Sequence, residues 1–138
     1  MTVRRPPADQ RPLRAPADLT AVWTSVLAGE PFRQRVVWLL FLDTARRPVG
    51  PLITLDNLPD GPYDVRPDNL VDLCREFVEG PGDAASVAFL MARPGAAPWT
   101  VSDRAWGRFL VKAGEALGPE PWPVHWAHQR RVEELVLP

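Results

Sequence analysis

Long apolar runs alternate along the chain with segments that have a helical period, and this alternation predicts most of the fold. Residues 35–43 and 86–91 are largely apolar and include β-branched and aromatic side chains, which is typical of strands buried on both faces. A second apolar run at 49–55 follows the first after a short turn, so the two are predicted to form an antiparallel hairpin. A fourth strand is predicted at 122–126, and the last residues are expected to form a short strand or a helical turn.

Three segments carry apolar residues at the spacing of an amphipathic helix: 18–28, 69–79 and 102–117. A short polar side chain is expected to cap each N-terminus, and the candidates are Asp18, either Asp68 or Asn69, and Ser102. A glycine follows each segment, as is common at helix C-termini. The third segment has the clearest period, and its buried stripe is predicted to include Trp106 and Phe109.

The order helix, two strands, helix, strand, helix, strand predicts an α/β fold in which helices flank a mixed β-sheet in a three-layer-like arrangement. At 138 residues, 46% of them hydrophobic, the chain suits one domain with a substantial core, which we expect at residues 16–138. Residues 1–15 are rich in arginine and proline, so they are predicted to be a disordered or loosely draped basic tail. A basic arm of this kind can alternatively bind phosphate groups.

The overall charge gives no reason to expect a polyanionic partner. The formal net charge is -1 and the pI is near 6.1, so neither nucleic acid nor a membrane surface is expected as a partner. A single cysteine, Cys74, cannot form an internal disulfide, and no apolar run is long enough to cross a bilayer. We therefore expect a cytoplasmic protein. The prevalence of arginine, alanine and proline is typical of bacteria with G+C-rich genomes.

The stretch "FLMARPGAAPWTVSDRAW" at residues 89–106 places a proline and a small-residue loop between a buried strand and a helix. Together with "VVWLLFLDTARRPVG" and "EALGPEPWPVH", it resembles the JAB/JAMM superfamily, most closely its RadC-like branch, over residues 34–125. The resemblance implies a cytidine-deaminase/JAB-like fold. In that family, His-x-His-Pro at the strand end and Ser-x-x-Asp at the helix start hold zinc, and a glutamate near the first strand acts as general base.

The frame of this motif carries over, but its metal ligands do not. Leu42 and Asp43 match the end of the family's first strand, while Pro94 and Ser102 match the motif proline and serine. The functional positions carry other residues: Met91 and Arg93 occupy the places of the two histidines, and Ala105 occupies the place of the aspartate. Arg35 lies about where the glutamate would be. The loop from Pro94 to Ser102 is also one residue longer than usual, and Asp103 lies two positions from the expected aspartate.

A thioether, a methyl group and a permanently charged guanidinium cannot form the three-ligand set of a catalytic zinc. The resemblance therefore implies a non-catalytic JAB/RadC-like domain, a pseudoenzyme without metal or other cofactor, that acts as a protein-interaction or regulatory module. The alternative is a hydrolase or small-ligand-binding enzyme with an unrecognised site. The vestigial cleft is then expected to be lined by Met91, Arg93, Ser102, Asp103 and His125. In this cleft Arg93 either binds a small anion or pairs with an acidic neighbour.

Tryptophans near the loops suggest where a partner could bind. Trp99, Trp122 and Trp126 lie in or beside loop-rich segments, and exposed tryptophan is enriched in binding surfaces. A protein partner or a second copy of the chain is the expected occupant, although these rings could equally cover the sheet.

Three further features have plainer interpretations. Cys74 is expected to be a small core residue, and the aspartates around residues 56–68 a solvated loop, since they lack the calcium-loop pattern. His125 and His128 could ligate a metal only from a helix, and they lie in a predicted strand segment.

Overall fold

A computed structural model describes residues 1–95, 99–128 and 131–136. The helices in it are α1 (Pro16–Leu27), α2 (Pro67–Val78) and α3 (Val101–Leu117). The strands are β1 (Thr2–Arg4), β2 (Val36–Leu42), β3 (Leu52–Leu55), β4 (Ser86–Ala92), β5 (His125–His128) and β6 (Arg131–Glu134). The chain is thus mixed α/β, as the periodicity predicts.

The strands form one mixed sheet in the order β1-β3-β2-β4-β5-β6. β2 and β3 form the predicted antiparallel hairpin, with Trp38 opposite Thr54. β2 also pairs antiparallel with β4 along its whole length, from Val36 opposite Ala92 to Leu42 opposite Ser86. β4 and β5 are the only parallel neighbours among the described strands, because α3 returns the chain to the same end of the sheet.

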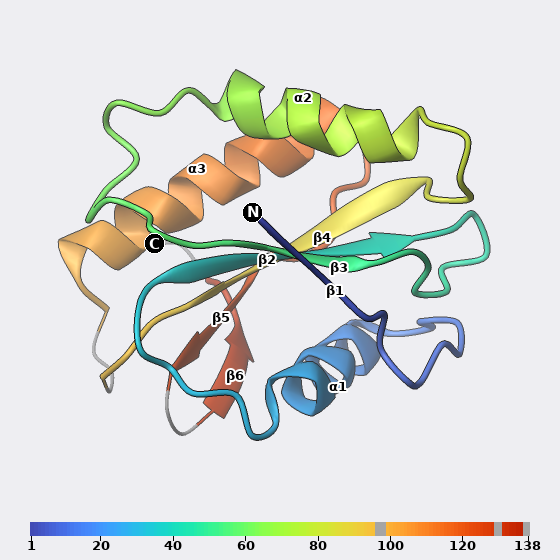
Figure 1. The fold of residues 1–138 in the computed structure, drawn as a ribbon, viewed down its shortest axis with the longest axis horizontal. Coiled ribbons are helices and arrows are strands. Elements are labelled where there is room, and N and C mark those ends of the chain that lie inside the picture. Colours follow the sequence, from blue (N-terminus) through green and yellow to red (C-terminus); the bar gives the residue numbers. More distant parts are fainter. Residues whose placement is uncertain (96–98, 129–130, 137–138) are drawn as a thin grey trace.

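Helices cover both faces of the sheet, with α2 and α3 on one face and α1 on the other (Figure 1). The central strands are apolar throughout because successive side chains point to opposite faces, and both faces are buried. Leu39, Phe41 and Phe89 face α2 and α3. Trp38 and Leu90 belong to the other core, together with Leu19 and Trp23 of α1 and further residues of the sheet.

The predicted helices are confirmed, but their N-terminal caps are not the predicted ones. Asp18 is the third residue of α1 rather than its cap, and its carboxylate accepts the Ala15 N–H at 3.0 Å. Arg66 precedes α2, and a proline follows it at the first helical position. α3 begins one residue earlier than predicted, and its N-cap is Thr100 instead of Ser102. In each case a proline or a competing hydroxyl shifts the helix start.

The N-terminal segment is the main departure from the predicted organisation. Where a disordered or loosely draped tail was expected, Thr2–Arg4 forms β1 and pairs antiparallel with β3. Leu13 is buried in the core on the α1 face, and its N–H donates to the Arg46 carbonyl at 2.9 Å. A few apolar residues in a proline-rich segment therefore suffice to attach it. The last predicted element is a strand, β6.

Candidate functional site

A buried cluster of charged residues lies where β4 ends and α3 begins. Met91 and Arg93 are two residues apart at the end of β4, so both side chains point to the face covered by α3. Arg35 directly precedes β2, whose first residue, Val36, is opposite Ala92. Asp103 lies in the first turn of α3. The pairing of β2 with β4 and the placement of α3 thus bring together four residues from three segments.

Asp103 is the centre of the cluster, and its side chain is completely buried. Both of its carboxylate oxygens accept from Arg93 Nε, at 2.7 and 2.9 Å. Arg35 Nη1 donates to Oδ1 at 3.1 Å and also contacts Met91 Sδ at 3.1 Å. The Thr100 backbone N–H donates to Oδ2 at 2.9 Å. Two guanidinium groups and the helix start therefore hold one carboxylate.

The same carboxylate completes the cap of α3. The Thr100 hydroxyl accepts the Asp103 N–H at 3.1 Å while Asp103 accepts the Thr100 N–H, which is a capping box. Thr100, Val101, Ser102 and Asp103 thus form a Thr-x-x-Asp pattern. The aspartate that this cluster contains is Asp103, in the first turn of α3. The capping-box signature is the sequence signal that would have identified both Thr100 and Asp103.

Burial alone would raise the pKa of Asp103, but the hydrogen bonds from Arg93, the Thr100 N–H and Arg35 outweigh burial and lower it. The carboxylate is therefore ionised at neutral pH. Arg93 and Arg35 therefore both bind one ionised carboxylate. A divalent cation does not fit this set: two guanidiniums occupy the space around the carboxylate and would repel it. No group of three or more metal-ligating side chains occurs in the described ranges 1–95, 99–128 and 131–136.

Aromatic rings pack beside the charged cluster. The Arg93 guanidinium lies over the Trp126 ring, 5.3 Å from its centroid, and the Trp99 and Trp126 centroids are 4.4 Å apart. The centroid of the His128 ring is 5.0 Å from that of Trp126. Arg93 is therefore held by a carboxylate on one side and an indole on another. A guanidinium held in this way is a structural element of the junction.

The predicted site residues fall into separate places. Met91, Arg93 and Asp103 come together as expected, and Arg35 joins them. Ser102 is the second residue of α3 and lies beside Asp103 in the chain. His125 is not in this cluster: it is completely buried on the α1 face, where its Nε2 is 2.7 Å from the Thr20 hydroxyl.

His125 fastens α1 to β5. Its Nδ1 lies 3.2 Å from the Pro123 carbonyl, which can only accept, so Nδ1 carries the proton and Nε2 accepts from Thr20. Burial lowers the pKa of His125, although the Pro123 carbonyl and the charge of Glu134 act in the opposite direction. The ring is thus a neutral core histidine. Its complete burial separates it from any substrate in this conformation.

The three tryptophans proposed as an interaction surface do not form one patch. Trp126 is 1% exposed and belongs to the core beneath α2 and α3. Trp99 stacks on it and is partly exposed. Trp122 packs against the opposite core, and its Nε1 donates to Ser86 Oγ at 2.8 Å. Of the two open interpretations for these rings, the geometry matches the covering of the sheet.

Cys74 is completely buried in α2, and burial raises the pKa of its thiol to about 12. The prediction of a small core residue is confirmed. Within the described residues, no helix combines the length and the apolar character needed to span a membrane.

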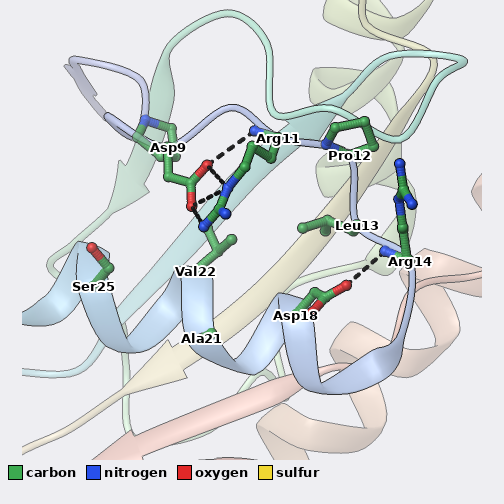
Figure 2. Close-up of a pocket in the computed structure, with 10 residues that line it drawn as sticks. Asp9, Arg11, Pro12, Leu13, Arg14, Asp18, Ala21, Val22 and Ser25 are labelled. Atoms are coloured by element: carbon green, nitrogen blue, oxygen red, sulfur yellow. Dashed lines mark hydrogen bonds and ion pairs between the residues drawn. The ribbon is translucent and has the colours of Figure 1, made fainter.

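A hollow of about 490 Å³ lies between the N-terminal segment and α1, and Figure 2 shows its lining. Three of the charged side chains that line it, Asp9, Arg11 and Asp18, have partners in the chain. Arg11 binds Asp9, with Nη2 2.8 Å from Oδ2, and Asp18 accepts the Arg14 backbone N–H at 2.7 Å. Nearby, Arg4 pairs with Glu30 at 2.7 Å. The Arg4 side chain thus connects the basic segment to Glu30, just beyond α1, whereas the Arg11–Asp9 pair lies within the segment.

No family model matches the chain, and no curated protein is significantly similar to it.

Proposed function

We propose that this chain is a non-catalytic JAB/RadC-like domain that acts in the bacterial cytoplasm as a protein-interaction or regulatory module. In this proposal, the strand-end junction that holds zinc in the active family is closed by an arginine–carboxylate cluster. The domain would then supply a rigid frame for contacts with a partner instead of a reaction centre.

The observation that supports the proposal is the position of Arg93. Arg93 and Met91 stand at the two places that the His-x-His-Pro pattern gives to histidine, and Thr100 and Asp103 form a Thr-x-x-Asp pattern at the helix start that is similar to the motif's Ser-x-x-Asp. A guanidinium 2.7 Å from the carboxylate supplies the positive charge that a metal would otherwise provide. Arg35, at the place of the general base, also contacts the carboxylate. It has no lone pair with which to accept a proton at neutral pH.

The experiment restores the ligands that the family pattern requires. The triple variant Arg35→Glu, Met91→His, Arg93→His combines two imidazoles with the existing Asp103 and removes both guanidiniums. If the junction has the proposed frame, the variant binds one zinc per chain that survives dialysis, as measured by elemental analysis. The wild-type chain is expected to bind none and to show no peptidase activity above background.

The matched control is the same triple variant with Asp103→Asn, which keeps the two histidines but weakens the third ligand. It is expected to lose most of the zinc. Zinc-dependent stabilisation in thermal unfolding provides a second readout, since a ligand that binds only the native state raises its stability. A folded triple variant that binds no zinc, or binds it equally well with and without Asp103, would count against the JAB-like frame.

A further inference from the structure

The outer edge of β6 has no partner strand among the described residues. β6 ends the sheet, and it pairs only with β5, with Trp126 opposite Glu133 and Ala127 opposite Val132. The Leu135 N–H donates to the Val124 carbonyl at 2.8 Å, so the odd-numbered residues of this segment bond to β5. The backbone groups of Val132 and Glu134 therefore point away from the sheet. Such an edge is a template for another strand.

A groove runs beside this edge on the α1 face. Its volume is about 430 Å³, and its lining includes Leu27 and Phe32, Thr24 at the end of α1, and Val132 of β6. α1 and β6 contact each other, and Figure 1 shows them side by side. An approaching strand would thus meet open backbone groups and, next to them, a partly apolar hollow whose lining also includes Glu30, His128 and Arg131. Beyond β6, Val136 leaves 79% of its surface exposed.

We propose that a second copy of this chain binds here, with the two β6 strands antiparallel across a two-fold axis at Val132. The two six-stranded sheets would then form one continuous sheet. This names a partner for the interaction module proposed above, and in that respect it rests on the proposed function.

The two-fold symmetry restricts the register. A two-fold axis normal to the sheet places the same face of both copies on the same side. Residues directly opposite each other then point to the same face, and since odd-numbered residues of β6 share one face, Arg131 must be opposite an odd-numbered residue of the other copy. Centring on Arg131 or on Glu133 would place identical charges opposite each other. With the axis at Val132, Arg131 of each copy is opposite Glu133 of the other copy, and the two Val132 side chains are opposite each other. Opposite charges and β-branched pairs both stabilise antiparallel neighbours.

Charges on an edge strand commonly prevent edge-to-edge pairing. Here the charges select among registers, because the strand carries both signs on one face. Arg131 and Glu133 already lie on the same side within one chain, with Arg131 Nε 3.9 Å from Glu133 Oε2. In the Val132-centred dimer, Arg131 and Glu133 of both copies would form one cluster in which positive and negative charges alternate.

The test is the mass of the full chain in solution, measured by sedimentation equilibrium over a range of concentrations. We expect a reversible dimer. Arg131→Glu alone and Glu133→Arg alone place like charges opposite each other twice, so each should weaken dimerisation roughly tenfold. The double variant Arg131→Glu, Glu133→Arg restores complementarity and should recover the wild-type dimerisation constant.

Val132→Pro removes an N–H that points away from β5, so it should block dimerisation while the fold persists by circular dichroism. Val132→Thr keeps the N–H and the branched shape, and it should still dimerise. A monomer at every concentration, or single charge variants that dimerise as well as the double variant, would overturn the proposal. The readout is association and not zinc content, so this test and that of the JAB-like frame fail independently.

Discussion

At the scale of single residues, Asp103 holds the junction together. It accepts hydrogen bonds from two guanidiniums and one backbone N–H while its side chain is 0% exposed. A buried ion pair of this kind contributes little net stability compared with apolar residues of the same shape, but the removal of one partner leaves a buried charge uncompensated. The cluster therefore fixes β2, β4 and α3 relative to one another by making other arrangements costly.

Asp103→Asn should consequently be strongly destabilising. The amide leaves Arg93 and Arg35 without a counter-charge, so we expect the free energy of unfolding to fall by about 3–5 kcal/mol. Asp68→Asn is the matched control, because Asp68 also lies in the first turn of a helix but is exposed, and it should cost less than about 1 kcal/mol. Urea titration measures both variants. Equal losses would mean that the guanidiniums find other partners.

His125 gives the molecule a defined pH dependence. Burial lowers the pKa of its imidazole in the folded chain, whereas the unfolded chain keeps the ordinary value near 6.5. Below that value the unfolded state binds more protons, so stability is complete above about pH 6.5 and falls as the pH decreases, by up to about 1.4 kcal/mol per unit. The fall ends at the lowered folded-state pKa.

Urea titrations between pH 7.5 and 5 check this expectation, with His125→Gln as the comparison. The glutamine variant cannot titrate and should show a flatter profile over this interval. Asp103 does not interfere, because its lowered pKa places its contribution at more acidic pH. Parallel profiles for the two proteins would show that the His125 pKa is not depressed.

At the scale of elements, the start of α3 depends on Thr100 rather than on Ser102. Thr100→Ala removes the hydroxyl that accepts the Asp103 N–H, and should cost about 1 kcal/mol of unfolding free energy. Ser102→Ala lies inside the helix, where alanine has the higher helix propensity, and should be neutral or slightly stabilising. Thermal unfolding of the two variants side by side distinguishes the positions. A larger loss for Ser102→Ala would contradict the observed cap.

The elements themselves could be predicted because the apolar pattern is long and strong. The central strands are buried on both faces, and α3 has a clear apolar stripe that includes Trp106, so the type of these elements was predicted correctly. The helix starts were less predictable. Several residues near each start can cap, and the choice depends on tertiary contacts such as the one between Arg93 and Asp103. β1 was missed because a short exposed strand has no periodic signal of its own.

The candidate site was predictable only in part, for a related reason. The spacing of Met91 and Arg93 places them on one face of a strand, but the sequence does not show which aspartate faces them. His125 was expected to line the cleft, but it lies on the α1 face: a strand pattern shows which residues share a face and does not show which helix covers that face. Whether a tryptophan covers the sheet or faces solvent depends on neighbours that come from distant segments, as the contact of Trp99 with Trp126 illustrates.

At the scale of the whole molecule, one sheet serves two cores. Successive residues of β2 and β4 point alternately to α1 and to the layer formed by α2 and α3. If either helical layer detached, one apolar face of the sheet would be exposed to water. A chain of this size with such shared strands is expected to unfold in one cooperative step. The single cysteine in α2 offers a way to test this.

Cys74 should react only when the whole molecule unfolds. Its thiol is completely buried and burial raises its pKa to about 12, so the reactive thiolate is scarce and inaccessible in the folded state. Labelling with a disulfide reagent at mildly alkaline pH should therefore be slow, and its rate should rise with urea in step with the loss of tryptophan fluorescence. The control Cys74→Ala, Asp83→Cys places a thiol in an exposed turn and should react at once without urea. If Cys74 is labelled rapidly at urea concentrations where the fluorescence is unchanged, α2 opens independently of the sheet and the single-step description fails.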